Sequence, residues 1–112
     1  MSELIPIKVI IWLCFCHWVA DFIMQSDWMA KEKAKSNKAL LIHCFSYGAT
    51  IGAMTLSPLF GLVQFLIHIP VDYVTSRINA KLYADKKIHW FFVSIGFDQF
   101  IHLSTLILLW RT

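Results

Sequence analysis

The sequence predicts an all-α fold, a bundle of four transmembrane helices that forms one membrane domain over residues 1–112. The first observation is composition, since 58% of the residues are hydrophobic and only 15% are charged, whereas soluble domains carry about 25% charged residues. The second is that the apolar residues gather into four runs, each close to the roughly 20 residues that a helix needs to cross a bilayer. The expected spans cover residues 4–24, 39–56, 59–76 and 89–110.

The first span has a proline, Pro6, at an early helical position and ends before a polar segment at residues 25–38. Proline is favoured in the first turn of a helix because its missing N–H has no partner there. Ser26 can cap a short helix in the polar segment through its hydroxyl. We expect this short helix to lie at the headgroup level of the membrane.

The second and third spans are joined by the turn signal Ser57-Pro58, which predicts a tight antiparallel hairpin. Gly48 and Gly52 form a GxxxG pattern in the second span. Such a pattern indicates either a homodimer face or close packing inside the bundle, and packing is the favoured interpretation. After the third span, a second basic loop leads to the fourth span, which begins at His89.

Basic residues concentrate in two polar segments, which lie on the same side of a four-span chain, while the opposite side offers the chain ends with Glu3 and Arg111. The positive-inside rule places the basic segments in the cytoplasm, so both termini are expected on the non-cytoplasmic side. The net charge of +3 forms no basic face typical of nucleic-acid binding, and membrane lipids are the expected partners. The basic residues are Lys31, Lys33, Lys35 and Lys38 in the first segment, and Arg77, Lys81, Lys86 and Lys87 in the second.

Three of the spans each carry a histidine and an aspartate four residues apart. Residues at this spacing lie on one face of an α-helix, about 6 Å apart. Lipid offers no partner to such polar faces, so all of them are expected to turn toward the interior of the bundle. The pairs are His17 with Asp21, His68 with Asp72 and Asp98 with His102; the second span adds His43 and Tyr47, and the polar stripes extend to Gln25, Gln64, Ser76 and Ser94.

The predicted topology puts each paired histidine deeper in the membrane than its aspartate, because the fourth span runs in the opposite direction and reverses their order. A layer of imidazoles next to a layer of carboxylates suits zinc, manganese or iron. Clustered carboxylates repel one another unless a cation or protons compensate, and helix bundles hold dimetal sites in this way. We therefore expect one or two divalent metal ions bound by His17, Asp21, His43, His68, Asp72, Asp98 and His102.

A structural network of polar contacts between helices is the alternative to a metal or proton site. Such contacts average under about 1 kcal/mol in membranes, while an aspartate at mid-helix costs about 3 kcal/mol to insert, so a functional site is favoured. Pro70 is expected to bend the third span, either as a packing kink or to free a carbonyl. Lys33 and Asn37 could reach a substrate phosphate, although contact with anionic lipids is the favoured interpretation.

Five parts of the sequence form recognisable motifs: His17-Trp-Val-Ala-Asp21-Phe22-Ile-Met-Gln25, Trp28-Met29-Ala30 with Lys33, Leu41-Ile-His43 with Tyr47, His68-x-x-x-Asp72, and Asp98-Gln99-x-x-His102. They give the chain a resemblance to a family of small bacterial and phage membrane proteins of unknown function. The resemblance implies a bacterial or phage origin and a multi-pass location in the bacterial inner (cytoplasmic) membrane. The placement of histidine and aspartate on spanning helices is also similar to the architecture of membrane-bound metal-dependent hydrolases.

Three functions are compatible with these residues. The first is a metal-dependent hydrolase acting on a lipid or lipid-linked phosphate, in which a metal ion activates water and an aspartate free of metal acts as general base; Asp21, Asp72 and Asp98 are its candidate catalytic residues. The second is a transporter of protons or a divalent cation, although the outer ends of the spans offer few polar groups for a path. The third is a non-catalytic phage or bacterial membrane module that binds a host membrane complex.

Overall fold

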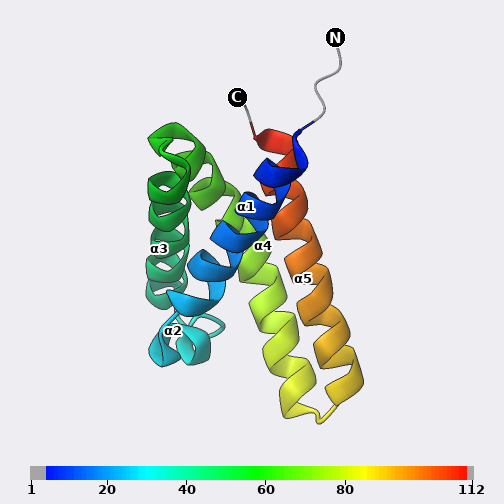
Figure 1. Ribbon diagram of the computed structural model, residues 1–112. Coiled ribbons are helices and arrows are strands. Elements are labelled where there is room, and N and C mark those ends of the chain that lie inside the picture. Colours follow the sequence, from blue (N-terminus) through cyan, green and yellow to red (C-terminus); the bar gives the residue numbers. More distant parts are fainter. Residues whose placement is uncertain (1–4, 111–112) are drawn as a thin grey trace.

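A computed structural model describes residues 5–110 of the chain (Figure 1). All regular elements in that range are helical, which confirms the predicted all-α class. The expected first residue of the first span, Leu4, and the terminal charges of Glu3 and Arg111 lie outside the described residues. The elements are α1 (Ile7–Trp18), the π-helical segment η1 (Val19–Ile23) that continues it, α2 (Asp27–Glu32), α3 (Asn37–Thr55), α4 (Pro58–Ala84) and α5 (Ile88–Leu109).

Three serines begin α2, α3 and α4 by the same contact. In each case the hydroxyl oxygen accepts a hydrogen bond from a backbone N–H three residues later, which satisfies one of the donors that the first turn of a helix leaves free. The predicted cap at Ser26 and the predicted turn at Ser57-Pro58 are both confirmed. The contacts join Ser26 to Met29, Ser36 to Ala39 and Ser57 to Phe60, each at 3.2 Å.

Glycines bring α3 and α4 into backbone contact. A Cβ atom added at Gly61 would lie 2.7 Å from Gly52 Cα, and one added at Gly48 would lie 2.5 Å from Phe65 Cβ. Only glycine leaves room for such an approach, as in other small-residue helix contacts. Gly48 and Gly52 therefore pack against α4 of the same chain, which agrees with the favoured interpretation of the GxxxG pattern. A homodimer through the same glycines stays a prediction.

The predicted basic loop after the third span is mostly helix. α4 continues well past Ser76, so Arg77 and Lys81 lie on a helix, and residues 85–87 alone connect α4 to α5. Side chains support this extension, because Arg77 donates a hydrogen bond to the Tyr73 carbonyl at 3.1 Å and lies 3.7 Å from the centre of the Tyr73 ring. The expectation of a loop was wrong because falling hydropathy marks the end of a membrane span, whereas backbone hydrogen bonds can continue into the polar region.

Hydrophobic side chains cover the outside of the molecule, while the described interior holds as many polar as hydrophobic residues. Leu59 is 72% exposed, Ile7 70% and Phe45 66%. Soluble monomers rarely expose apolar surface on this scale. Among the described helices, α4 and α5 are long and apolar enough to cross a membrane.

The hydrophobic core lies mostly toward one end of the bundle and meets the buried polar residues at Tyr47, whose ring stacks on His68. α1 begins, α3 turns into α4 and α5 ends at one end, whereas α2 lies toward the other (Figure 1). At the first end the Trp12 indole N–H donates to the Met54 carbonyl at 3.2 Å, and the rings of Phe60 and Trp110 lie 5.3 Å apart. The buried apolar core consists of Leu13, Cys16, Ala20, Tyr47, Ile51, Phe60 and Leu106.

Gly61→Ala is expected to lower the Tm of the purified protein, because the new Cβ meets the backbone of Gly48 and Gly52 and such overpacking costs about 1–3 kcal/mol. Gly96→Ala is the matched control, since nothing lies within 4 Å of a Cβ there and alanine favours a helix over glycine by about 1 kcal/mol. Thermal unfolding in detergent, followed by circular dichroism, measures both. An unchanged Tm for Gly61→Ala would contradict the backbone contact.

Candidate metal centre

The structure buries all seven residues predicted as metal ligands. Each is at most 5% exposed, and together they come from α1, η1, α3, α4 and α5. Six of them form three overlapping groups whose donor atoms lie within 4.8 Å of one another and could hold a metal ion. The six are Asp21, His43, His68, Asp72, Asp98 and His102, and the seventh, His17, lies beside them.

His43 and His68 form the middle of this centre, with their Nε2 atoms 3.2 Å apart. Asp21 Oδ1 lies 3.1 Å from His43 Nε2 and 3.7 Å from His68 Nε2. Asp72 Oδ2 lies 3.4 Å and 3.9 Å from the same two nitrogens. Ligands bound tetrahedrally at about 2.0–2.2 Å from one ion are roughly 3.3–3.6 Å apart. The donor atoms thus form two triangles that share the His43–His68 edge and have close to the spacing of ligands to one ion.

Asp98 and His102 extend the centre along α5. His102 Nε2 lies 3.0 Å from Asp98 Oδ1, and these two residues form a group with Asp72. The ring of His102 stacks on that of His68 at 4.0 Å between ring centres, and the Tyr47 ring also lies 4.0 Å from that of His68. Stacking orients the imidazoles. Because the groups share members, two ions would share ligands, as they do in dimetal bundles.

The π-helical segment η1 places Asp21. The Met24 N–H donates to the Val19 carbonyl at 2.9 Å, five residues back along the chain, where an α-helix would use the carbonyl four residues back. π-Helical turns of this kind are rare and occur frequently at functional sites. Here the segment holds Asp21 against His43 on α3 and His68 on α4. The spacing of four residues predicted the face of Asp21, but no signal in the sequence predicted the π-helix.

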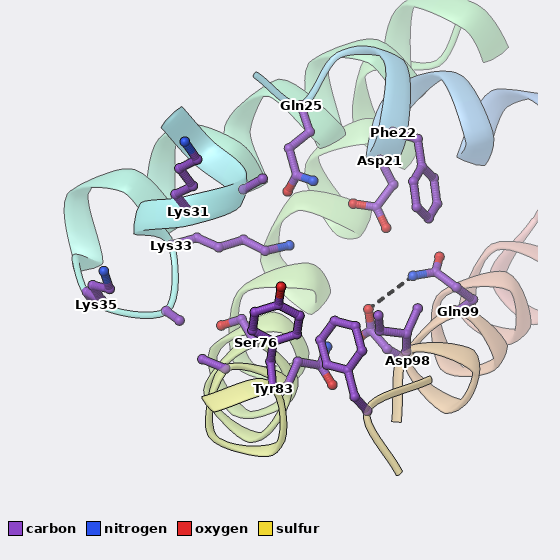
Figure 2. Close-up of a pocket in the computed structure, with 16 residues that line it drawn as sticks. Asp21, Phe22, Gln25, Lys31, Lys33, Lys35, Ser76, Tyr83, Asp98 and Gln99 are labelled. Atoms are coloured by element: carbon purple, nitrogen blue, oxygen red, sulfur yellow. Dashed lines mark hydrogen bonds between the residues drawn. The ribbon is translucent and has the colours of Figure 1, made fainter. Parts of the chain in front are cut away.

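His17 has neutral partners at both ring nitrogens. Nδ1 lies 3.0 Å from the Tyr47 hydroxyl, and Nε2 contacts Gln99 Oε1. His17 therefore accepts from the Tyr47 hydroxyl and donates to Gln99, whose Nε2 in turn donates to Asp98 at 3.2 Å (Figure 2). Its Nε2 is also 3.7 Å from Asp21. In this arrangement His17 orients Asp98 through Gln99, and service as a metal ligand would require it to release one of its partners. Gln99 entered the sequence analysis through the family resemblance alone.

Lys33 belongs to the centre, although lipid contact was the favoured interpretation for it. Its Nζ lies 3.1 Å from Asp72 Oδ2 and 3.3 Å from Oδ1, and its side chain is 16% exposed. Figure 2 shows Lys33 extending toward the middle of the pocket, whereas Lys31 and Lys35 do not. Hydropathy could not indicate which of several lysines in one polar segment turns inward.

Asn37, also considered for phosphate binding, takes part in a different contact. Its Oδ1 accepts a hydrogen bond from the Arg77 guanidinium at 3.2 Å, so it joins the start of α3 to the helical extension of α4. This contact lies at the exposed end of the bundle and leaves Asn37 outside the centre.

The charges of the centre match a divalent cation. If the carboxylates of Asp21, Asp72 and Asp98 are all ionised, they contribute three negative charges, and the Lys33 ammonium beside Asp72 contributes one positive charge. Two negative charges remain when the histidines are neutral, the form in which imidazole binds metal. One divalent ion would neutralise the centre.

A pocket of about 420 Å³ opens beside the carboxylates (Figure 2). Asp21, Asp98 and Lys33 line it, and its wall contains no histidine. The four histidines therefore lie farther from this pocket than Asp21 and Asp98 do, whereas the separate layers of imidazoles and carboxylates stay a prediction, since each group that could hold a metal contains both residue types.

The fold and the site define the class of protein. It is a helical bundle with a hydrophobic exterior and a buried His/Asp centre that could hold a metal ion. The chain belongs to the family described as Protein of unknown function (DUF3307), whose sequence profile matches residues 9–112. This is consistent with the predicted resemblance to an uncharacterised family. A search of curated proteins and a search of solved structures each found no match.

Elemental analysis of the purified protein is expected to find at least one divalent metal ion per chain. His43→Ala and His68→Ala each remove a central donor and are expected to lower metal affinity by at least about 100-fold, since even residues behind the ligands contribute about 10–100-fold. His89→Ala is the control because His89 is exposed at the start of α5. Wild-type protein that holds no metal and keeps its Tm in chelator would contradict the assignment.

Proposed function

We propose that this protein is an integral membrane metallohydrolase that acts on a lipid or lipid-linked phosphate. α1 with η1, α3, α4 and α5 are its four spans in the bacterial inner (cytoplasmic) membrane, with both chain ends on the non-cytoplasmic side. The hydrophobic exterior supports this location, because acyl chains can surround side chains such as Phe45 and Leu59. The basic residues near α2 and the α4–α5 connection support the orientation.

The contact between the metal centre and the pocket carries the proposal. Asp21 and Asp98 belong both to the groups that could hold an ion and to the pocket wall. Lys33 lines the same wall beside Asp72. A phosphate in the pocket would therefore meet a bound cation on one side and an ammonium group on the other, which are the two kinds of charge that stabilise phosphoryl transfer.

The residues can divide the work of hydrolysis. A divalent ion held by Asp21, His43, His68 and Asp72 would lower the pKa of a bound water and polarise a phosphoryl oxygen. Asp98 is the candidate general base because it lines the pocket beside the proposed ion. Thr75 at 2.8 Å, Gln99 at 3.2 Å and His102 at 3.0 Å hold its two oxygens in place. It takes a proton from water as the water oxygen bonds to phosphorus and the bond from phosphorus to the leaving oxygen breaks.

The far end of the bundle favours hydrolysis over transport. An apolar core that includes Leu13, Ile51 and Leu106 fills the interior between the metal centre and the end where α5 stops. Gln64 and Thr105 add polar groups to this half, but they are bonded to each other, with the Thr105 hydroxyl donating to Gln64 Oε1 at 3.3 Å. A path for protons or cations needs polar groups along its whole length.

Asp98→Asn is expected to keep its metal and to lower kcat by at least about 100-fold, because general-base catalysis contributes about 10²–10⁴-fold. The assay uses ³¹P NMR to measure hydrolysis of vesicles of phosphatidic acid, phosphatidylglycerol or polyprenyl phosphate by the metal-loaded protein. Asp85→Asn is the control, since Asp85 lies in the exposed connection after α4. A different result would indicate a transporter: none of the lipids is hydrolysed, and metal ions enter proteoliposomes in a flux that Asp72→Asn abolishes. A membrane partner whose capture survives loss of the cluster would indicate a non-catalytic module.

Lys33→Ala is expected to raise KM by at least about tenfold while metal content stays unchanged, because a charge-assisted contact to phosphate is worth about 1.5–3 kcal/mol. Lys38→Ala removes the same charge from the same basic segment at an exposed residue that does not line the pocket, so it controls for attraction to anionic lipid. Equal KM values for the two variants would contradict a role of Lys33 in phosphate binding.

A further inference from the structure

Three residues that line the pocket each have a buried side-chain oxygen without a hydrogen-bond partner among residues 5–110. These oxygens are Gln25 Oε1, Ser76 Oγ and Asn79 Oδ1. Ser76 is only 5% exposed. Polar groups in such positions normally have partners, and neither the proposed metal site nor the phosphate contact at Lys33 uses these three.

Two of these residues continue the face of α4 that carries Asp72. Ser76 follows Asp72 by four residues and Asn79 follows Ser76 by three, so they lie on one helix face at about 6 Å and 10 Å along the axis. Along α4, these neutral polar residues therefore follow the charged residue of the metal centre. A ligand with its phosphate at Lys33 would place its next group against Ser76 and Asn79.

The chemistry of these groups fits hydroxyls. An amide and a hydroxyl each both donate and accept, as the hydroxyls of a polyol or sugar do. An ammonium headgroup fits less well, because the carboxylates of the wall, Asp21 and Asp98, would face the proposed cation, and the basic side chains of Lys31, Lys33 and Lys35 line the same pocket. The pocket volume of about 420 Å³ lies within the range of about 300–1,000 Å³ that small-molecule sites occupy.

We propose that Gln25, Ser76 and Asn79 bind the hydroxyls of a lipid headgroup, so that the substrate is a phospholipid or lipid-linked phosphate bearing a polyol or sugar. The apolar side chains of Phe22, Phe91 and Ile95 line the same pocket, where they would contact the hydrocarbon part of the lipid. The position of the phosphate rests on the proposed function, whereas the selectivity for hydroxyls does not depend on turnover.

Two short-chain lipids test this proposal on the wild-type, metal-loaded protein. Dihexanoyl phosphatidylglycerol and dihexanoyl phosphatidylpropanol carry the same charge and differ by two hydroxyls. We expect phosphatidylglycerol to bind at least about tenfold more tightly, a difference of about 1.4 kcal/mol, by isothermal titration. ³¹P NMR checks that the lipids stay intact, and where they are hydrolysed the two KM values replace the two Kd values.

Ser76→Ala and Asn79→Leu are expected to reduce the preference for phosphatidylglycerol by at least about threefold each without changing metal content. Ser94→Ala is the control because Ser94 does not line the pocket. Equal affinity for the two lipids, no binding of either, or a preference that persists in both variants would overturn the proposal. A preference without turnover would remove the hydrolase and keep the hydroxyl site, whereas turnover with equal KM values would do the reverse.

Discussion

The charge of the buried carboxylates is the constraint from which the arrangement of the bundle follows. An unpaired ion in a protein interior costs several kcal/mol, so each aspartate needs a partner that a single helix does not supply. Asp21 on η1 meets His43 on α3, Asp72 on α4 meets Lys33 at the end of α2, and Asp98 on α5 accepts from Thr75 on α4. Each of these contacts crosses between elements, so together they join the helices around one point.

Close packing of α3 and α4 provides the geometry for this convergence. Gly48 lies five residues after His43, and Gly61 lies seven residues before His68, so the backbone contact of the glycines lies about one and a half to two turns from the two histidines. Holding the helix axes so close at that level lets the imidazole Nε2 atoms approach to 3.2 Å. The glycine contact therefore helps to set the distance between the two central donors, His43 and His68.

Helical spacing made much of the centre predictable from sequence. Polar residues four apart must share a face, and in a chain with a hydrophobic exterior that face has nowhere to go but inward, so all seven buried histidines and aspartates could be identified. The remaining features depend on tertiary contacts. Lys33 turns inward to contact Asp72, and η1 departs from α-helical hydrogen bonding where hydropathy is uniform. α4 continues past its apolar stretch, where Arg77 contacts Tyr73. None of these has a signature in the periodicity of the sequence.

The π-helical turn at Val19–Ile23 makes the count of residues between His17 and the α2 segment as important as their chemistry. Winding the same residues as an ordinary α-helix would turn everything after this segment by about 100° relative to everything before it, because a π turn takes up about one residue more than an α turn. Hydropathy, charge and composition would not differ, yet the segment that follows, with Lys33 at the end of α2, would no longer lie where it does relative to His17. Along this stretch, the number of residues and the winding of the backbone position the site as much as the residue types do.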